Sequence, residues 1–359
     1  MESINTYLKG RGAQINPHNC FNQQEMVVDV NDILDEEEQL EILQQKQNTK
    51  YIEVFPKSII NWVKSPDIPG LYSMNPYQGC EHGCTYCYAR PTHEYRGYSA
   101  GKEFEQNILI KKNAPQLLRE CFEKPNWQSS SIMLSGNTDC YQPAEKKFQI
   151  TRELLKVCLA FRHPVSIITK NALIARDADV LEQLAALDLV HVTFSLSTLN
   201  EDLKRVMEPR TSTAKNVLKT IQLLSEKKIP INVNVAPIIP SINDSEIFDL
   251  AKAVSAAGAL SIHYIVVRLN DQVEFIFKDW LERNFPDRYQ KCIHQIESVH
   301  GGSVSDKRTF VRMRGEGNWA EIINKQFKLS QKKYFADKNF PSLDTSIFIN
   351  DSRRQGKLF

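Results

Sequence analysis

Hydrophobic and polar positions between residues 131 and 267 follow two alternating periodicities. Short runs rich in Val, Ile and Leu predict strands, and between them apolar residues recur every three or four positions, as on one face of a helix. The predicted strands cover 131–135, 165–169, 190–197, 231–236 and 260–267, and the predicted helices cover 148–161, 177–187 and 213–224. Another helix is expected after Asn243, which with Glu246 has the spacing of a capping box. This alternation predicts an α/β fold whose parallel sheet has helices outside it.

Two of the predicted strands have one polar face. The strand over 190–197 alternates apolar residues with polar ones, namely His191, Thr193, Ser195 and Ser197. The strand over 231–236 does the same with Asn232 and Asn234. Because parallel strands that are covered on both faces are usually apolar throughout, we favour an open or partial barrel with a wet lumen. The alternative is an ordinary sheet whose polar residues are paired internally.

Composition and charge are those of a globular protein. The chain has 359 residues, of which 42% are hydrophobic and 25% charged, with a net charge of +2. No global field therefore draws it to nucleic acid or to an acidic membrane. We see neither a secretory signal nor an apolar run long enough to span a bilayer, so we expect a cytoplasmic protein without a membrane partner. Expected parts are an N-terminal extension over 1–66, a core over 67–285 and a C-terminal extension with a basic tail over 286–359.

Three of the eight cysteines lie close together in one predicted loop. Cys80, Cys84 and Cys87 have the spacing C-x3-C-x2-C, with Gly79 and Gly83 around them. Glycine lets a backbone wrap closely around a ligand. Three thiolates can bind three irons of a [4Fe–4S] cube and leave the fourth iron open to another ligand. The spacing therefore predicts a cluster that binds a substrate as well as carrying electrons.

Other interpretations of the three cysteines stay open. One alternative is zinc, with His82 or His93 as the fourth ligand, although structural zinc sites usually combine two short ligand pairs. Simple electron transfer is a second alternative, but it typically needs a fourth cysteine ligand. Chance spacing is the third.

The cysteine loop resembles that of the radical S-adenosylmethionine (SAM) superfamily. That family has C-x3-C-x-aromatic-C, and Tyr86 occupies the aromatic position. The text NPYQGCEHGCTYCYAR over 75–90 also resembles a bacterial subgroup related to spore photoproduct lyase, as do Arg11-Gly12-Ala13 and SGNTDCYQP over 135–143. The resemblance implies a partial (β/α)6 barrel of the TIM type. It also implies a [4Fe–4S] cluster and SAM as cofactors, and an electron donor of the flavodoxin or ferredoxin type.

In that family, the amine and carboxylate of SAM bind the open iron. One electron then breaks the sulfur–C5′ bond, and the 5′-deoxyadenosyl radical removes a hydrogen atom from a substrate. The resemblance implies a set of SAM contacts beside Tyr86: Ser135, Asn137, Asp139, Lys170, Ser195, Ser197, Ala236 and Ile238. One departure is notable. Where many members have Gly-Gly-Glu for the methionyl amine, this chain has Ser135-Gly136-Asn137 and no glutamate.

Cys140 is a candidate catalytic residue. It follows a predicted strand end near the expected SAM site, where a thiol could return a hydrogen atom to a substrate radical, as lyases of DNA photoproducts require. The alternative is a buried, inert thiol. Aligned through Thr138-Asp139, the donor thiol of the spore enzyme would fall nearer Gly136, which weakens the case for photoproduct repair.

The C-terminal segment suggests two macromolecular partners. Residues 306–359 contain twelve Lys or Arg against six Asp or Glu, with aromatic residues between them, a composition that suits single-stranded nucleic acid. A solvated charged surface is the alternative. The final residues 355–359, QGKLF, resemble peptides that dock on bacterial sliding clamps. The favoured substrate is nucleic acid. The other candidates are a radical enzyme acting on a protein or a metabolite, and a zinc-stabilised nucleic-acid-binding module without turnover.

Overall fold

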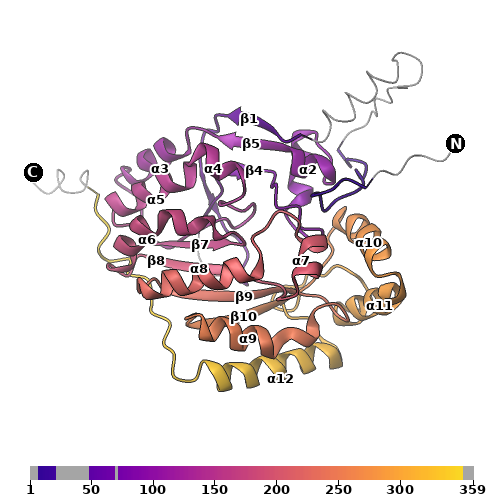
Figure 1. Ribbon diagram of the computed structural model, residues 1–359. Coiled ribbons are helices and arrows are strands. Elements are labelled where there is room, and N and C mark those ends of the chain that lie inside the picture. Colours follow the sequence, from indigo (N-terminus) through magenta and orange to yellow (C-terminus); the bar gives the residue numbers. More distant parts are fainter. Residues whose placement is uncertain (1–6, 22–47, 69–71, 351–359) are drawn as a thin grey trace, which may run out of the picture.

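The computed structural model of the chain describes residues 7–21, 48–68 and 72–350 (Figure 1). Its main sheet has seven strands in the order β10-β9-β8-β7-β6-β3-β2. These strands are β2 (Ile60–Trp62), β3 (Tyr72–Met74), β6 (Ile132–Leu134), β7 (Val165–Thr169), β8 (Val190–Ser195), β9 (Ile231–Ile238) and β10 (Ser261–Val266). Six are parallel, and only β2 runs antiparallel to its neighbour β3. Because β2 and β10 are the two edges, the sheet is a partial barrel, as expected.

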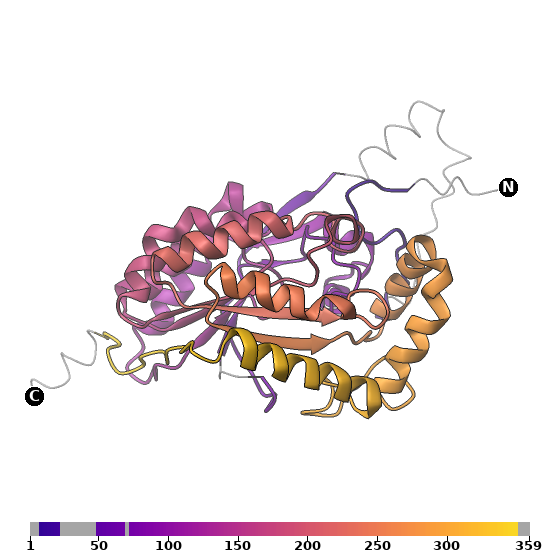
Figure 2. The same ribbon diagram turned by 60° about the horizontal axis from the view of Figure 1, so that its bottom comes forward.

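Helices cover the outer face of this sheet between successive strands. They are α5 (Ile150–Ala160), α6 (Ala178–Ala185), α8 (Ala214–Glu226) and α9 (Ile247–Ala256), so the predicted strand–helix alternation is confirmed. Later helices are α10 (Val273–Asn284), α11 (Tyr289–Val299) and α12 (Gly317–Tyr334). Figure 2 shows α12 alongside α9, while α10 and α11 lie beyond the arrowheads of the strands. No helix of the described residues is long and apolar enough to cross a bilayer.

The polar strand faces lie where the pattern placed them. Val190, Val192 and Phe194 of β8 have no exposed surface and belong to the main hydrophobic core, whereas His191 and Thr193 between them are partly exposed. Each fully buried side chain of this size stabilises the fold by roughly 1.5–3 kcal/mol. The core therefore lies between strands and helices, and the inner face is left polar.

One local prediction is wrong. The side chain of Asn243 does not cap a helix. Its oxygen accepts a hydrogen bond from the Ile239 amide at 2.7 Å, and its nitrogen donates to the Ser197 carbonyl at 2.7 Å. Glu246 instead accepts from Thr198 Oγ1 at 2.6 Å. Both side chains join the ends of β8 and β9, because buried backbone groups there need partners more than the helix end does.

A second, smaller sheet carries the cysteine loop. Its order is β1 (Lys50–Val54), β5 (Asn107–Lys111) and β4 (Tyr77–Gln78). Cys80 follows β4 by two residues, and β4 itself follows the main-sheet strand β3, so the loop begins after the carboxyl end of β3. The short helices α2 (Lys102–Gln106), α3 (Ala114–Phe122), α4 (Ala144–Phe148) and α7 (Glu201–Met207) complete the described fold.

The open edge of the barrel is spanned by a C-terminal segment. The amide of Val266 in β10 donates to the Met313 carbonyl at 3.0 Å. Arg312 beside it forms an ion pair of 2.5 Å with Asp67, which lies between β2 and β3. The segment around Met313 therefore connects the two edges of the sheet, through a backbone hydrogen bond to β10 and an ion pair to the segment between β2 and β3.

Candidate active site

The cysteine loop lies between β4 and the 3-10 helix η2 (Arg90–Arg96). Cys80 and Cys84 are buried and Cys87 is partly buried, and all three are free of disulfides. Gly79 and Gly83 adopt left-handed backbone angles, with φ of +79° and +70°. Side chains are disfavoured at such angles, so glycine allows the tight path of the loop.

Gln142 holds the backbone on both sides of Cys80. Its side-chain nitrogen donates to the Gly79 carbonyl at 3.1 Å, and its side-chain oxygen accepts from the Glu81 amide at 2.9 Å. Gln142 has no exposed surface. The loop after β6 therefore positions the first cysteine through one amide group.

A buried ion pair between Arg90 and Glu105 contacts the backbone of the cysteine loop. Arg90 donates to the Cys84 carbonyl at 2.9 Å and to Glu105 at 2.6 Å, and neither charged side chain is exposed. Glu105 also accepts from the backbone amides of Gly12 and Ala13, at 3.1 and 2.8 Å. Glu105 and Arg90 thus connect the N-terminal motif Arg11-Gly12-Ala13 to the backbone of the cysteine loop.

The donor set is three buried or partly buried free thiols, which fit a group of strong positive charge such as an iron–sulfur cluster. Burial raises the pKa of all three thiols, so their thiolate forms need a strong positive charge beside them, which bound iron would supply. Among the described residues, no three His, Cys, Asp or Glu side chains converge on one point as a zinc ion requires. The corners of a cube are separated and do not need such convergence.

Neither histidine of the zinc alternative is placed as a ligand. His82 lies 3.4 Å from Asp139 through Nδ1 and 3.1 Å from the Asn171 amide through Nε2. His93 is fully buried and stacks on Tyr98, with ring centroids 4.9 Å apart. The geometry therefore does not favour the zinc-binding interpretation.

The loop after β6 contains three of the predicted SAM contacts. Ser135 has φ of +78°, and its hydroxyl donates to the Thr138 carbonyl at 2.7 Å. The amide of Asn137 donates to Asn75 Oδ1 at 2.9 Å. Asp139 accepts from Thr169 Oγ1 and from the Lys170 amide, both at 2.8 Å. The side chains of Ser135 and Asp139 thus have internal partners that shape this loop beside the cysteines.

Glu208 joins several predicted residues into one buried network. Its carboxylate accepts from the Tyr86 hydroxyl and, at 2.8 Å, from Ser197 Oγ. It also lies 2.6 Å from Lys204 Nζ and 3.4 Å from Lys170 Nζ. Burial opposes its ionisation, but the two ammonium groups offset this and hold the pKa of Glu208 well below its usual range.

Lys170 therefore has a partner within the protein. Burial opposes its charge, but Glu208 raises the pKa of Lys170 above its ordinary value. Its ammonium group also donates to the Ala236 carbonyl at 3.2 Å and lies 5.5 Å from the centre of the Tyr86 ring. Lys170 remains a cation at the strand edge, close to the cysteine loop.

The remaining predicted contacts lie on neighbouring strand ends. Ser195 ends β8 and pairs in register with Asn234, while Ala236 and Ile238 are in the last part of β9. Ser195 is 9% exposed, and Ile238 is fully buried in the main core. All of these residues lie toward the carboxyl ends of parallel strands, where open α/β sheets commonly bind ligands.

Cys140 is placed differently from the other candidates. Its side chain has no exposed surface and belongs to the main hydrophobic core. Its backbone is fixed by Ser135 Oγ, at 2.8 Å, and by Thr151 Oγ1, at 2.6 Å. This burial supports the alternative of an inert thiol, and the donor role stays a prediction.

Sequence reasoning missed Gln142, Glu105 and Glu208. Gln142 belongs to the motif over 135–143, but the sequence does not show that its side chain binds the backbone on both sides of Cys80. Glu208 follows α7 and carries no local signal, because its burial depends on elements far apart in the chain. The role of a charged residue such as Glu208 can be assigned only when its partners in space are known.

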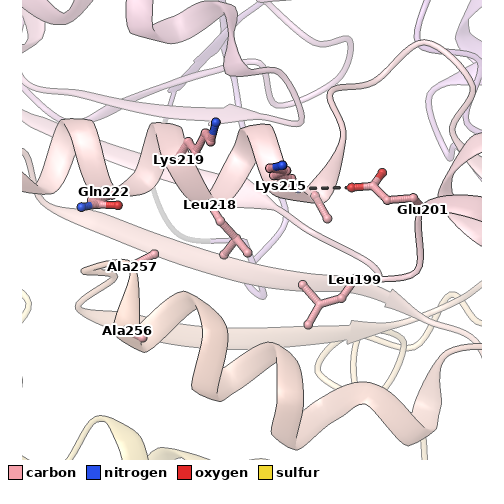
Figure 3. A pocket seen from close by; sticks show the side chains of 9 residues that line it. Leu199, Glu201, Lys215, Leu218, Lys219, Gln222, Ala256 and Ala257 are labelled. Atoms are coloured by element: carbon pink, nitrogen blue, oxygen red, sulfur yellow. Dashed lines mark hydrogen bonds between the residues drawn. The ribbon is translucent and has the colours of Figure 1, made fainter.

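The described surface also has a hollow of about 520 Å³ between α8 and the end of α9 (Figure 3). Figure 3 shows Leu218 of α8 pointing to the side on which Leu199 lies, and Glu201 accepts from the Lys215 amide at 3.2 Å. None of the cysteines or predicted SAM contacts lines it. The hollow is therefore not the candidate site.

Comparison with known proteins identifies a family. The model of the Radical SAM superfamily matches residues 74–254, about half of the chain. An uncharacterized protein of Mycobacterium tuberculosis is 33% identical over 238 residues, which cover 66% of this chain and 70% of that protein. An uncharacterized protein of Methanocaldococcus jannaschii is 29% identical over 240 residues, covering 67% and 85% of the two chains.

Solved structures of spore photoproduct lyase share the fold. A mutant of that enzyme with dinucleoside spore photoproduct superposes with a TM-score of 0.58 over 82% of each chain, at 14% identity. Another mutant, with bound AdoMet and dinucleoside spore photoproduct, has a TM-score of 0.55 at 12% identity, over 81% of this chain and 80% of that one. At these identities the likeness extends to the fold alone.

Proposed function

Because the chain belongs to the Radical SAM superfamily, we propose that Cys80, Cys84 and Cys87 bind the [4Fe–4S] cluster which that family uses with SAM. The protein is a radical SAM enzyme. The observation that carries the residue assignment is the buried loop of three free thiols beside the carboxyl ends of six parallel strands. When bound, the cluster supplies the electron that cleaves SAM to a 5′-deoxyadenosyl radical, which takes hydrogen from a substrate.

The chain's own residues position these groups. Gln142 and Arg90 hold the backbone at Cys80 and Cys84, at distances of 2.9–3.1 Å and 2.9 Å. We assign the SAM contacts to the strand edge formed by Ser135, Asn137, Asp139, Lys170, Ser195, Ser197, Ala236 and Ile238. Lys170 supports this assignment, because its partly exposed ammonium group lies at the strand edge and would donate to the methionyl carboxylate as well as to Glu208.

The substrate that we propose is nucleic acid. Two observations support it. The basic composition of residues 306–359 suits phosphates, and the exposed aromatic rings of Tyr88 and Phe310 suit bases. Spore photoproduct lyase shares the fold, and one of its structures contains dinucleoside spore photoproduct. That ligand is established for the lyase and is not assigned to this chain. A protein or a metabolite is the second candidate, because the strand edge itself does not discriminate among them.

Radical SAM enzymes need an electron donor, and we propose a flavodoxin or ferredoxin. The clamp-binding motif over 355–359 lies outside the described residues, so clamp binding stays a prediction. Absence of clamp binding by a peptide of residues 350–359 would remove its support.

The cofactor assignment is tested with a triple variant, in which Cys80, Cys84 and Cys87 become alanine. After anaerobic reconstitution, wild-type enzyme with dithionite and SAM should release 5′-deoxyadenosine, measured by liquid chromatography, and should contain iron and sulfide. The triple variant should lose all three signals. Cys121→Ala, at a partly buried cysteine of α3, is the matched control and should behave as wild type. Equal iron and 5′-deoxyadenosine in the triple variant would refute the assignment.

The substrate is tested by isotope transfer. The reduced enzyme is incubated with SAM and deuterated single-stranded DNA, or with deuterated protein and metabolite extracts. Deuterium in the 5′-deoxyadenosine identifies the hydrogen source. Transfer only from protein or metabolites would replace nucleic acid as the substrate class, while leaving the cofactor assignment intact.

A further inference from the structure

One arginine at the barrel mouth has no counter-ion. Arg268 follows β10 by two residues and is partly buried, and no hydrogen bond or ion pair with another described residue is observed for it. Its neighbours Val267 and Leu269 are packed in the apolar cluster beneath α10 and α11, with 2% and 0% exposure. The backbone at this point is therefore fixed while the guanidinium remains unpaired.

The nearby carboxylates are already used. Asp67 is paired with Arg312 at 2.5 Å, and Asp306 is paired with Arg308 at 2.8 Å. Burial lowers the pKa of Arg268, and the charge of Arg312 lowers it further. A half-buried cation without a partner is costly unless a ligand supplies the opposite charge.

Aromatic surface lies on the same side of the molecule. Tyr88, next to Cys87, is 50% exposed. Its hydroxyl donates to the Gly136 carbonyl at 2.6 Å, after β6, whereas Arg268 follows the edge strand β10. Both residues therefore lie at the carboxyl-terminal end of the parallel strands, one after β6 and the other after β10. Phe310, two residues before Arg312, is 67% exposed.

We propose that Arg268 binds a backbone phosphate of single-stranded nucleic acid, with Tyr88 and Phe310 as stacking surfaces for its bases. This rests on the proposed function and assigns the substrate class to a specific residue. An unpaired guanidinium at the same end of the barrel as two exposed aromatic rings suits the alternation of phosphates and bases. An acidic peptide would use the cation but would leave the two aromatic rings exposed, so nucleic acid is favoured.

The test uses fluorescence anisotropy of a labelled oligothymidylate of about 12 nucleotides, a length within the usual site size. The reconstituted enzyme with SAM is titrated anaerobically at several salt concentrations. Arg268→Gln should weaken binding about tenfold, as expected for loss of a charged hydrogen bond. It should also lower the slope of log affinity against log salt by about one. Tyr88→Leu and Phe310→Leu should weaken binding without changing that slope.

The controls separate this subsite from general charge and from the cofactor assignment. Arg283→Gln removes an arginine of α10 that is paired with Asp279 at 2.9 Å, and should bind as wild type. An oligonucleotide with uncharged methylphosphonate linkages should bind weakly and equally to wild type and Arg268→Gln. Unchanged affinity in Arg268→Gln, or equal dependence on Arg268 for polyglutamate, would overturn the proposal. Release of 5′-deoxyadenosine without oligonucleotide is measured separately, so failure of the cofactor assignment would show there alone.

Discussion

The hydroxyl of Tyr86 donates a hydrogen bond to the carboxylate of Glu208, which lies 122 residues later in the chain. Tyr86 is the residue before Cys87, so this bond connects the cysteine loop to the segment after α7. The same carboxylate holds Lys170 and Lys204. Glu208 thus pairs with the ammonium groups of Lys170 and Lys204 and also accepts from the aromatic residue of the cysteine motif.

We predict that Glu208→Gln is strongly destabilising. It leaves the buried Lys204 and the partly buried Lys170 without their counter-charge, and removing one partner of a buried ion pair typically costs about 3–5 kcal/mol. Urea unfolding followed by circular dichroism measures the loss. Glu153→Gln removes a surface partner of Lys156 and should change the free energy of unfolding by about 1 kcal/mol or less. Equal stability of the two variants would contradict the role of this network.

Gln142→Leu should weaken retention of the cluster. The substitution leaves the Gly79 carbonyl and the Glu81 amide without their partner, and each unsatisfied buried group costs about 1–3 kcal/mol. We expect iron loss to a chelator to accelerate several-fold, measured from the fading of visible absorbance. Gln183→Leu, on α6, is the control, because its amide contacts only the Asp179 carbonyl of the same helix. Identical rates in all three proteins would show that Cys80 does not need this support.

Gly12→Ala should detach the N-terminal motif from the cysteine loop. A β-carbon at this position would lie 1.6 Å from the Gly83 carbonyl oxygen, so the two backbones must separate. We expect lower stability and lower iron content than in wild type. Gly97→Ala is the comparison: it meets no atom within 4 Å, and its left-handed φ of +80° alone should cost about 1 kcal/mol. A milder effect at Gly12 than at Gly97 would contradict this packing.

His163 should make stability depend on pH. It is fully buried and stacked on Phe122, with ring centroids 4.2 Å apart, and burial lowers its pKa to about 4. Below the unfolded value of about 6.5, only the unfolded chain is protonated, so stability falls as pH decreases from about 6.5 toward 4. At pH 5 this group costs about 2 kcal/mol relative to pH 7.

His163→Gln should therefore reduce the difference in unfolding free energy between pH 7 and pH 5 by about 2 kcal/mol. Urea titrations at the two pH values measure it. The comparison within the variant cancels its general loss of packing. A pH dependence equal to that of wild type would show that His163 is protonated in the folded protein.

The sequence by itself determined the secondary-structure order, the partial barrel and the family. Strand and helix periodicities depend on residues close in the chain, which is why β7 was predicted to the residue and β8 and β10 nearly so. The cysteine spacing is equally local. The capping box at Asn243 failed because the partners of that side chain are Ser197, which follows β8, and Pro237, which lies in β9.

Only the tertiary structure decided which polar side chains share one environment. The sequence analysis named Asp139, Lys170 and Ser197 as SAM contacts. It could not show that Glu208 holds Lys170 and Ser197, or that Asp139 lies beside His82. Whether a charge is paired, as in Arg312, or unpaired, as in Arg268, depends on groups brought together from distant segments. Electrostatic pairing acts through space, and the order of residues along a chain does not encode distance.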